Sequence, residues 1–144
     1  MAKIRLGIIG MGNMGAIHSG NVKDGKCPDF ELVAIADRKE SRREFAKANL
    51  PGITCFETAE EMLSSGLIDA CTVAVPHYDH AKYAMECMKH GIHVMVEKPA
   101  GVYTKQVREM NEEAKRHPEV VFGMMFNQRT NHVYRKMREL VKSG

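Results

Sequence analysis

A glycine-rich segment near the N-terminus has the spacing of a loop that binds phosphate groups. Residues 10–15 are Gly-Met-Gly-Asn-Met-Gly, which matches the pattern G-x-G-x-x-G. The apolar run at 4–9 predicts a strand directly before this loop, and residues 13–22 predict a helix directly after it. This is the context in which the pattern binds the pyrophosphate of a dinucleotide. A glycine turn without a ligand is the alternative interpretation.

Each glycine of this loop would have its own task. Gly10 permits the tight turn, Gly12 lets the backbone approach the pyrophosphate, and Gly15 lets the helix pack close to the strand. The phosphates would meet the N–H groups and the positive dipole end at the start of the helix, where Asn13 and Met14 lie. The loop therefore predicts five residues that bind a cofactor.

An acidic residue follows the second predicted strand at residues 31–36. Asp37 lies 22 residues after Gly15, close to the roughly 20 expected of the acid that hydrogen-bonds to an adenosine ribose. A carboxylate there accepts from a free 2′-hydroxyl and repels a 2′-phosphate, which favours NAD over NADP. Arg38 leaves NADP possible, because a guanidinium can stack on adenine or clamp a 2′-phosphate. Asp37 could alternatively be only a turn residue.

Two further predicted strands end in polar segments. Residues 70–75 are followed by Pro76-His77, and residues 92–96 are followed by Glu97-Lys98-Pro99. Both segments would lie at the carboxyl edge of the sheet, where we expect the nicotinamide ring. An ammonium beside a proline-fixed turn can donate to a substrate oxygen or relay its proton, so Lys98 is the candidate catalytic residue. A surface charge pair of Glu97 and Lys98 is the alternative.

The elements that must position these residues alternate along the whole chain. Strands are expected at 4–9, 31–36, 53–56, 70–75, 92–96 and 120–126. Helices are expected at 13–22, 39–49, 59–65 with Thr58 as N-cap, around 81–88, and at 105–116 and 130–141. Alternating strands and helices predict βαβ units in an α/β, doubly wound, mostly parallel sheet, the Rossmann fold. Ligands of such sheets bind at the carboxyl ends of the strands.

Composition and charge exclude several classes of protein. The chain of 144 residues has the length of one domain, and its net charge of +3 is too small to indicate nucleic acid as a partner. The most basic stretch, residues 38–47, also contains two glutamates. We interpret it as a solvated helix face, whose basic members are Arg38, Lys39, Arg42, Arg43 and Lys47.

The same reasoning bears on the compartment and on metals. No apolar run approaches the roughly 18 residues that span a bilayer, and we see no signal peptide. The cysteines lack a C-x-x-C pair, which argues against zinc and for reduced thiols in the cytosol; they are Cys27, Cys55, Cys71 and Cys87. His77 and His80 are three apart but have no evident third ligand. We therefore expect a cytoplasmic protein with no metal and no membrane segment.

Taken together, these motifs resemble a known family. The glycine loop, Asp37, the segment 76–81 (Pro-His-Tyr-Asp-His-Ala) and the segment 91–99 (Gly-Ile-His-Val-Met-Val-Glu-Lys-Pro) are similar to the glucose–fructose oxidoreductase, inositol dehydrogenase and rhizopine catabolism family, Gfo/Idh/MocA. The resemblance covers essentially the whole chain. It implies an oxidoreductase that transfers a hydride between NAD(P) and a sugar, polyol or related hydroxy compound.

The resemblance also implies roles for single residues. Lys98 would lie beside the nicotinamide and the substrate, Glu97 would contact the cofactor, and the peptide bond before Pro99 is often cis in this family. The position of His77 is commonly Asn there, which puts its cofactor contact in doubt. Arg129 lies where the family crosses into its second domain and would approach the cofactor. A histidine corresponding to His80 starts a helix, and we interpret it as structural.

The domain organisation follows from the same resemblance. Residues 1–126 would form the NAD(P)-binding domain, and residues 127–144 a crossover helix leading to a C-terminal substrate domain that this chain lacks. Such a chain would bind the cofactor without turnover, and the full-length enzyme would be a homo-oligomer. Two other classes are alternatives: a dinucleotide-binding sensor or partner module without catalysis, and an S-adenosylmethionine methyltransferase, in which the Glu-Lys-Pro segment would have no role.

Overall fold

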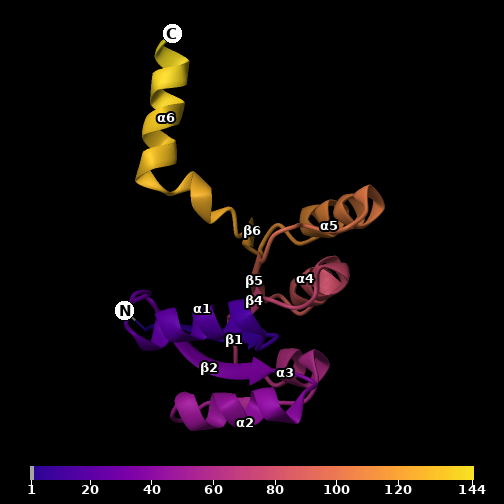
Figure 1. Cartoon of the computed structure of the whole chain (residues 1–144). Coiled ribbons are helices and arrows are strands. Elements are labelled where there is room, and N and C mark those ends of the chain that lie inside the picture. Colours follow the sequence, from indigo (N-terminus) through magenta and orange to yellow (C-terminus); the bar gives the residue numbers. More distant parts are fainter. Residues whose placement is uncertain (1) are drawn as a thin grey trace.

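Six strands form one sheet in the computed structural model, which describes residues 2–144 (Figure 1). The strands are β1 (Ile4–Ile9), β2 (Phe30–Ala36), β3 (Thr54–Phe56), β4 (Ala70–Val73), β5 (His93–Val96) and β6 (Phe122–Met124). Their order in the sheet is β3-β2-β1-β4-β5-β6, and every neighbouring pair is parallel. This is the doubly wound order of the Rossmann fold, so the predicted fold is confirmed.

Six helices accompany the strands in the described residues, and the first five of these connect the strands and cover both faces of the sheet. They are α1 (Asn13–Lys23), α2 (Glu40–Asn49), α3 (Ala59–Ser64), α4 (His80–Lys89), α5 (Thr104–Arg116) and α6 (His132–Ser143), with two short 3-10 helices, η1 (His77–Asp79) and η2 (Asn127–Arg129). Thr58 caps α3 as predicted: its hydroxyl accepts from the Glu61 N–H, and the Glu61 carboxylate accepts from the Thr58 N–H, both at 3.2 Å. Such a capping box satisfies two N–H groups that a helix start leaves free.

The two-residue period of the strands divides the core into two apolar clusters. Ile8 and Ile35 belong to a cluster with Ala46 of α2, whereas Ile9 and Ala34 belong to a larger cluster that includes residues of α3, α4 and α5. Successive side chains of a strand point to opposite faces, which explains this alternation. The central strands are therefore clamped on both sides, and their carboxyl ends are held in place.

Two strands end two residues earlier than the sequence predicts. The fourth strand ends at Val73 rather than at residue 75, because the Val75 carbonyl contacts the ring of His80 and Pro76 has no N–H for a ladder. The last strand ends at Met124 rather than at residue 126, where the Phe126 N–H turns back to the Met124 carbonyl at 2.7 Å. In both places the chain leaves the sheet early to form a short 3-10 helix.

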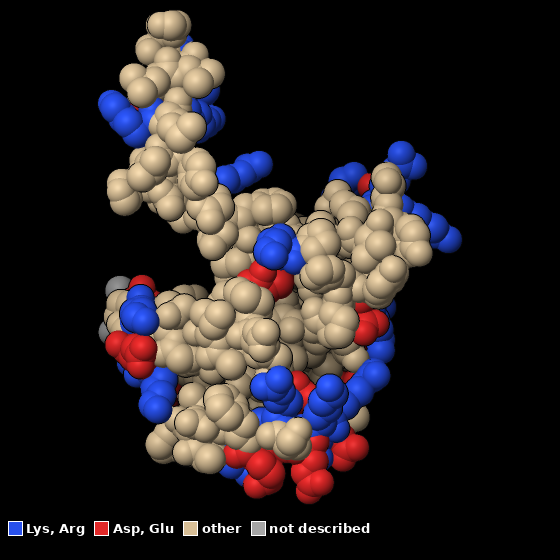
Figure 2. Space-filling view, in the orientation of Figure 1, with Lys and Arg blue, Asp and Glu red and all other residues tan. Residues whose placement is uncertain are grey.

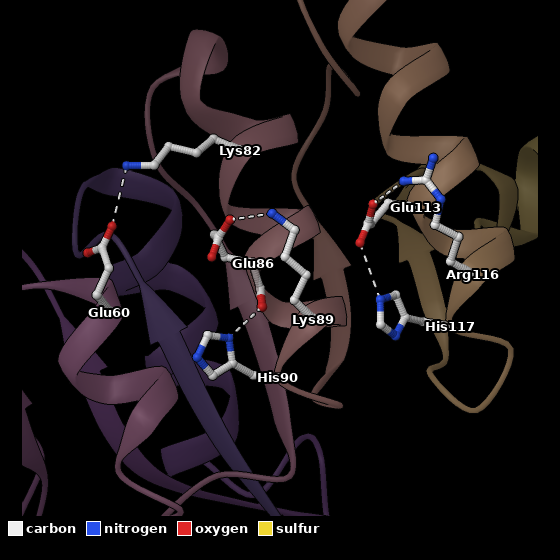
Figure 3. A network of polar contacts seen from close by, with 8 residues as sticks. All are labelled: Glu60, Lys82, Glu86, Lys89, His90, Glu113, Arg116 and His117. Atoms are coloured by element: carbon white, nitrogen blue, oxygen red, sulfur yellow. Dashed lines mark hydrogen bonds and ion pairs between the residues drawn. The ribbon is translucent and has the colours of Figure 1, made fainter.

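Ion pairs and hydrogen bonds join side chains of α3, α4 and α5 (Figure 3). They join Lys82 to Glu60, Lys89 to Glu86, and both Arg116 and His117 to Glu113, at 2.7–3.4 Å. Burial raises the pKa of Glu113, but the hydrogen bonds from Arg116 and His117 outweigh it and lower the pKa. An exposed pair such as Lys82 with Glu60 contributes about 0–1 kcal/mol, so it supports the helices modestly.

Helix α6 stands away from the sheet (Figure 1). None of its residues is buried, and Tyr134, Met137 and Leu140 are each more than half exposed. Over the described residues, no helix is long and apolar enough to cross a membrane, and no cluster of three or more His, Cys, Asp or Glu side chains could hold a metal ion.

Candidate cofactor site

The glycine loop closes tightly between three strands. Gly10 has a φ of +93°, and its N–H donates to the Ala36 carbonyl at 2.8 Å. A Cβ at Gly10 would lie 2.7 Å from the Ala74 carbonyl oxygen, and a Cβ at Gly15 would overlap the carbonyl oxygen of Gly10. The structural tasks predicted for both glycines, the tight turn and the close helix packing, are therefore seen.

The start of α1 is open toward this loop. Gly12 is the N-cap residue, no side chain caps the helix, and a Cβ at Gly12 would meet no atom within 4 Å. Asn13 and Met14, in the first turn, are both exposed. Uncapped N–H groups and the positive end of a helix dipole are suited to a phosphate. The residues present therefore fit a pyrophosphate at this position.

Asp37 is anchored beside the loop at the end of β2. One carboxylate oxygen accepts from the Met11 N–H at 2.7 Å, and the other accepts from the Lys39 N–H at 2.9 Å. The second contact is that of a turn residue, so the alternative interpretation of Asp37 describes part of what it does. A carboxylate has about four acceptor positions, and Asp37 also borders a cavity. It therefore keeps the capacity to accept from ribose hydroxyls.

The cavity beside Asp37 has a volume of about 310 Å³. It is bounded by the glycine loop, by the ends of β1, β2 and β4, and by side chains from α4 and the start of α2. Pro76 lines it, but His77 does not, and His77 is exposed. A volume of this order lies at the lower end of the range for small-molecule pockets, so the cavity suits one end of a dinucleotide rather than the whole of it.

The basic stretch around α2 is only partly a solvated helix face, so that prediction was wrong in part. Arg38, Lys39 and Arg42 line the cavity, and Figure 2 shows basic side chains gathered around α2 and α3 with acidic side chains among them. The Arg43 side chain donates to the carbonyls of Asp37 and Arg38 at 2.8 and 3.0 Å. Arg38 was predicted to contact the cofactor, whereas Lys39 and Arg42 were not; they border the cavity because the chain after Asp37 and the first turn of α2 lie beside it.

A tyrosine that the sequence analysis did not single out also borders the cavity. The Tyr83 hydroxyl of α4 accepts from the Arg38 guanidinium at 3.1 Å. The bond joins residues 45 positions apart in the chain, so no local pattern could have indicated it. The bond holds the Arg38 guanidinium beside the cavity.

The second group of predicted residues lies at the ends of β4 and β5. Lys98 is exposed, and the Lys98-Pro99 peptide bond is cis, as the family resemblance implied. His80 is 1% exposed, and its ring nitrogens lie 2.6 Å from the Pro99 carbonyl and 2.9 Å from the Val75 carbonyl. His80 thus joins the two loops that follow β4 and β5, which fits the structural role expected of it.

Glu97 makes its contacts within the protein. Its side chain is 5% exposed; Oε1 lies 2.7 Å from Nε2 of His18 on α1, and Oε2 accepts from the Lys98 N–H at 3.1 Å. The alternative interpretation of Glu97 and Lys98 as a surface charge pair is therefore wrong for Glu97, whose side chain is buried against His18. A direct contact of Glu97 with the cofactor stays a prediction. His18 carried no pattern in the sequence and was missed.

Arg129 is not brought to the cavity. It lies in η2, it is exposed, and its guanidinium carbon is 5.4 Å from the centre of the Phe126 ring. This places it on the side of the domain from which α6 projects. Its approach to a cofactor stays a prediction for a longer form of the protein.

Comparisons with known proteins give one consistent result. A family model described as an oxidoreductase family with an NAD-binding Rossmann fold, Gfo/Idh/MocA, matches residues 4–124. The chain is 31% identical over 141 residues to a myo-inositol 2-dehydrogenase of Thermotoga maritima, covering 98% of this chain and 41% of that protein. It is 34% identical over 97 residues to a scyllo-inositol 2-dehydrogenase (NADP(+)) of Bacillus subtilis, covering 67% of this chain and 30% of that protein.

A solved structure extends the likeness to three dimensions. The chain superposes with a TM-score of 0.92 and 28% identity on a scyllo-inositol dehydrogenase of Lactobacillus casei with bound NAD(H) and scyllo-inositol. The match covers 99% of this chain and 42% of that one. The chain thus spans less than half the length of the relatives it matches.

Proposed function

Because the chain belongs to the Gfo/Idh/MocA oxidoreductase family, as an NAD-binding Rossmann domain, we propose that it binds NAD along the carboxyl edge of its sheet. The pyrophosphate would lie at the start of α1, the adenosine in the cavity beside Asp37, and the nicotinamide near Lys98. We propose that the domain serves an enzyme that transfers a hydride between NAD(P) and a sugar, polyol or related hydroxy compound.

One observation carries the cofactor proposal. The uncapped start of α1 at Gly12 and the anchored carboxylate of Asp37 border the same cavity. The first group suits a phosphate and the second suits a ribose with free hydroxyls. Together they match the two recognition elements that a dinucleotide needs at its adenosine end, which a glycine turn without a ligand would not explain.

The chemistry at the other end would fall to Lys98. When bound, the nicotinamide ring supplies the acceptor or donor of the hydride. Lys98 is exposed at the carboxyl end of β5, and its backbone N–H is held by the buried Glu97. In this place the neutral amine of Lys98 would accept the proton that leaves the hydroxyl and pass it to solvent, and the ammonium would return a proton to the carbonyl oxygen in the reverse reaction. Hydride and proton then leave the carbinol by separate routes, which balances the oxidation.

The substrate, the wider organisation and the location of the protein are further parts of the proposal. The inositol dehydrogenases among its relatives support a polyol or sugar substrate. We propose that residues 1–126 are the cofactor domain and that residues 127–144 lead into a substrate domain, which the exposed apolar side chains of α6 support. We also propose a homo-oligomeric, cytoplasmic enzyme; its four free cysteines fit a reducing compartment.

Titration of the purified chain with NAD tests the proposal. We expect saturable binding of NAD, stabilisation in a thermal-shift assay that S-adenosylmethionine does not produce, and no NADH absorbance when inositols, other polyols or aldoses are added. Turnover requires a substrate carbon held about 3–3.5 Å from the ring, and Lys98 is uncovered in this chain. Failure to bind NAD would contradict the cofactor assignment, and substrate-dependent NADH formation would show that no substrate domain is needed.

Asp37 should set the preference between the two cofactors. The unmutated chain is expected to bind NAD more tightly than NADP. Both Asp37→Ala and Asp37→Asn should lower the preference for NAD over NADP by about tenfold, because they remove the repulsion between the Asp37 carboxylate and the 2′-phosphate of NADP. A like-charge contact near a surface costs on the order of 1–4 kcal/mol. The measurement is the ratio of the two dissociation constants. Asp37→Asn isolates the effect of the charge, since its amide oxygen can still accept from the Met11 N–H and keep the loop in place. Equal affinities in the unmutated chain would shift attention to Arg38.

A further inference from the structure

We infer that His18 is a positioning residue for the nicotinamide end of the site, acting through Glu97 on the loop that carries Lys98. The inference rests on the proposed function, because it concerns how this domain holds a dinucleotide. It adds a residue from α1, the helix assigned to the pyrophosphate, to the machinery at the end of β5.

The contacts form a continuous path from one element to the other. His18 lies three residues after Gly15 on α1, and its Nε2 is 2.7 Å from Oε1 of Glu97. The other oxygen of Glu97 accepts from the Lys98 N–H at 3.1 Å. The side chains of His18 and Glu97 are 16% and 5% exposed, so little water is available to replace either partner.

The carboxylate depends on this histidine for its orientation. Glu97 has two partners in the structure, and the Lys98 N–H comes from the adjacent residue, which moves with it. His18 is therefore its anchor to a distant part of the fold. A hydrogen bond to a charged group typically changes an equilibrium by about 10- to 100-fold, so loss of this bond would free the Glu97 carboxylate and, with it, the bond that holds the Lys98 N–H.

The backbone on both sides of Lys98 has further contacts that do not involve His18. The Pro99 carbonyl contacts the His80 ring at 2.6 Å, and the Glu97 N–H donates to the Val73 carbonyl at 3.0 Å. With these contacts in place, removal of His18 should free the Glu97 carboxylate and shift the backbone at Lys98, against which the nicotinamide end would lie, without unfolding the loop. The pyrophosphate region begins at Gly12, on the first turn of α1, and does not use the His18 ring.

This separation makes the role testable against a purely structural one. ADP-ribose has the adenosine, pyrophosphate and both riboses of NAD and lacks the nicotinamide ring. A histidine that only stabilises the fold would affect both ligands alike. A histidine that positions the nicotinamide end would affect NAD alone.

The experiment is calorimetric titration of NAD and of ADP-ribose into three variants of the chain. His18→Leu removes the donor and should weaken NAD about tenfold, the scale of one hydrogen bond to a charged group, while ADP-ribose changes by less than about twofold. His18→Gln places an amide N–H near the position of Nε2 and should restore most of the NAD affinity. His90→Leu is the matched control, because His90 is exposed at the far end of α4 and its ring contacts the Glu86 carbonyl, outside the proposed site.

A measurement without substitutions covers the case in which His18→Leu does not fold. NAD should shift the ring resonances of His18 in the unmutated chain more than ADP-ribose does, with the His90 ring unchanged. Equal losses for both ligands, or none, or equal shifts of the His18 ring would overturn the inference. If the unmutated chain binds ADP-ribose but His18→Leu binds NAD normally, only the inference falls. If the unmutated chain binds neither ligand, the proposed function falls and the inference falls with it.

Discussion

Replacing Lys98 by alanine is expected to lower kcat by about 100-fold or more in a form of the protein that also carries a substrate domain, as for a lost general acid–base group. The substitution removes the ammonium that would bind the substrate oxygen and relay its proton. NAD affinity should change little, because the glycine loop and Asp37 hold the other end of the cofactor, and because the substitution keeps the Lys98 N–H and its bond to Glu97, so the loop backbone stays in place. Steady-state kinetics and NAD titration on the same preparation separate the two effects.

Two matched variants sharpen this result. Lys98→Arg keeps the positive charge but cannot give up a proton, so it should retain substrate affinity better than Lys98→Ala while kcat stays low. Lys105→Ala removes an exposed lysine of α5 whose ion pair with Glu109 has a distance of 3.8 Å, and it should leave turnover unchanged. Near-normal turnover of Lys98→Ala would instead restore the view of Lys98 as a surface charge.

Replacing Gly15 by alanine is expected to abolish measurable NAD binding and to lower the thermal stability of the chain. The new Cβ would overlap the Gly10 carbonyl oxygen, which is backbone of the loop itself. Helix α1 and the loop must then separate, so the N–H groups at the start of α1 would no longer meet the pyrophosphate. Overpacking of this kind costs about 1–3 kcal/mol in stability. Differential scanning calorimetry and NAD titration record both changes.

Gly12→Ala provides the counterpart that distinguishes ligand from fold. A Cβ at Gly12 meets no protein atom within 4 Å, and its φ of −69° suits any residue. The chain should therefore keep its melting temperature, while the methyl group occupies the space through which a pyrophosphate approaches the backbone. A loss of NAD affinity at unchanged stability is the expected pattern. Unchanged affinity in Gly12→Ala would favour a glycine turn that serves the fold alone.

The features that sequence predicts well here are those whose cause is local. The glycine loop depends on residues within six positions, and the two-residue and helical periods of the strands and helices record which side chains face the core. Even the strand order follows, because right-handed crossovers leave few ways to stack alternating strands and helices. Asp37 was found because its distance from the loop is set by the length of one helix and one strand.

The features that were missed arise from contacts across the sheet. His18 meets Glu97 from 79 positions away, and Tyr83 meets Arg38 from 45 positions away. Contacts between residues so far apart produce no periodic pattern in the sequence. Lys39 and Arg42 were not predicted at the site for a related reason: the basic residues there alternate with glutamates, as on many solvated helices, and only the path of the chain after Asp37 brings these two to the cavity.

The buried ring of His80 has a consequence for the thermodynamics of binding. By contacting the carbonyls of both Val75 and Pro99, it ties together two loops that would otherwise lose conformational freedom when a ligand arrives. That entropy is lost during folding instead, and preorganisation of this kind strengthens binding without adding a contact. The arrangement also makes the two loops a single mechanical unit, so displacement of either one must draw the other with it.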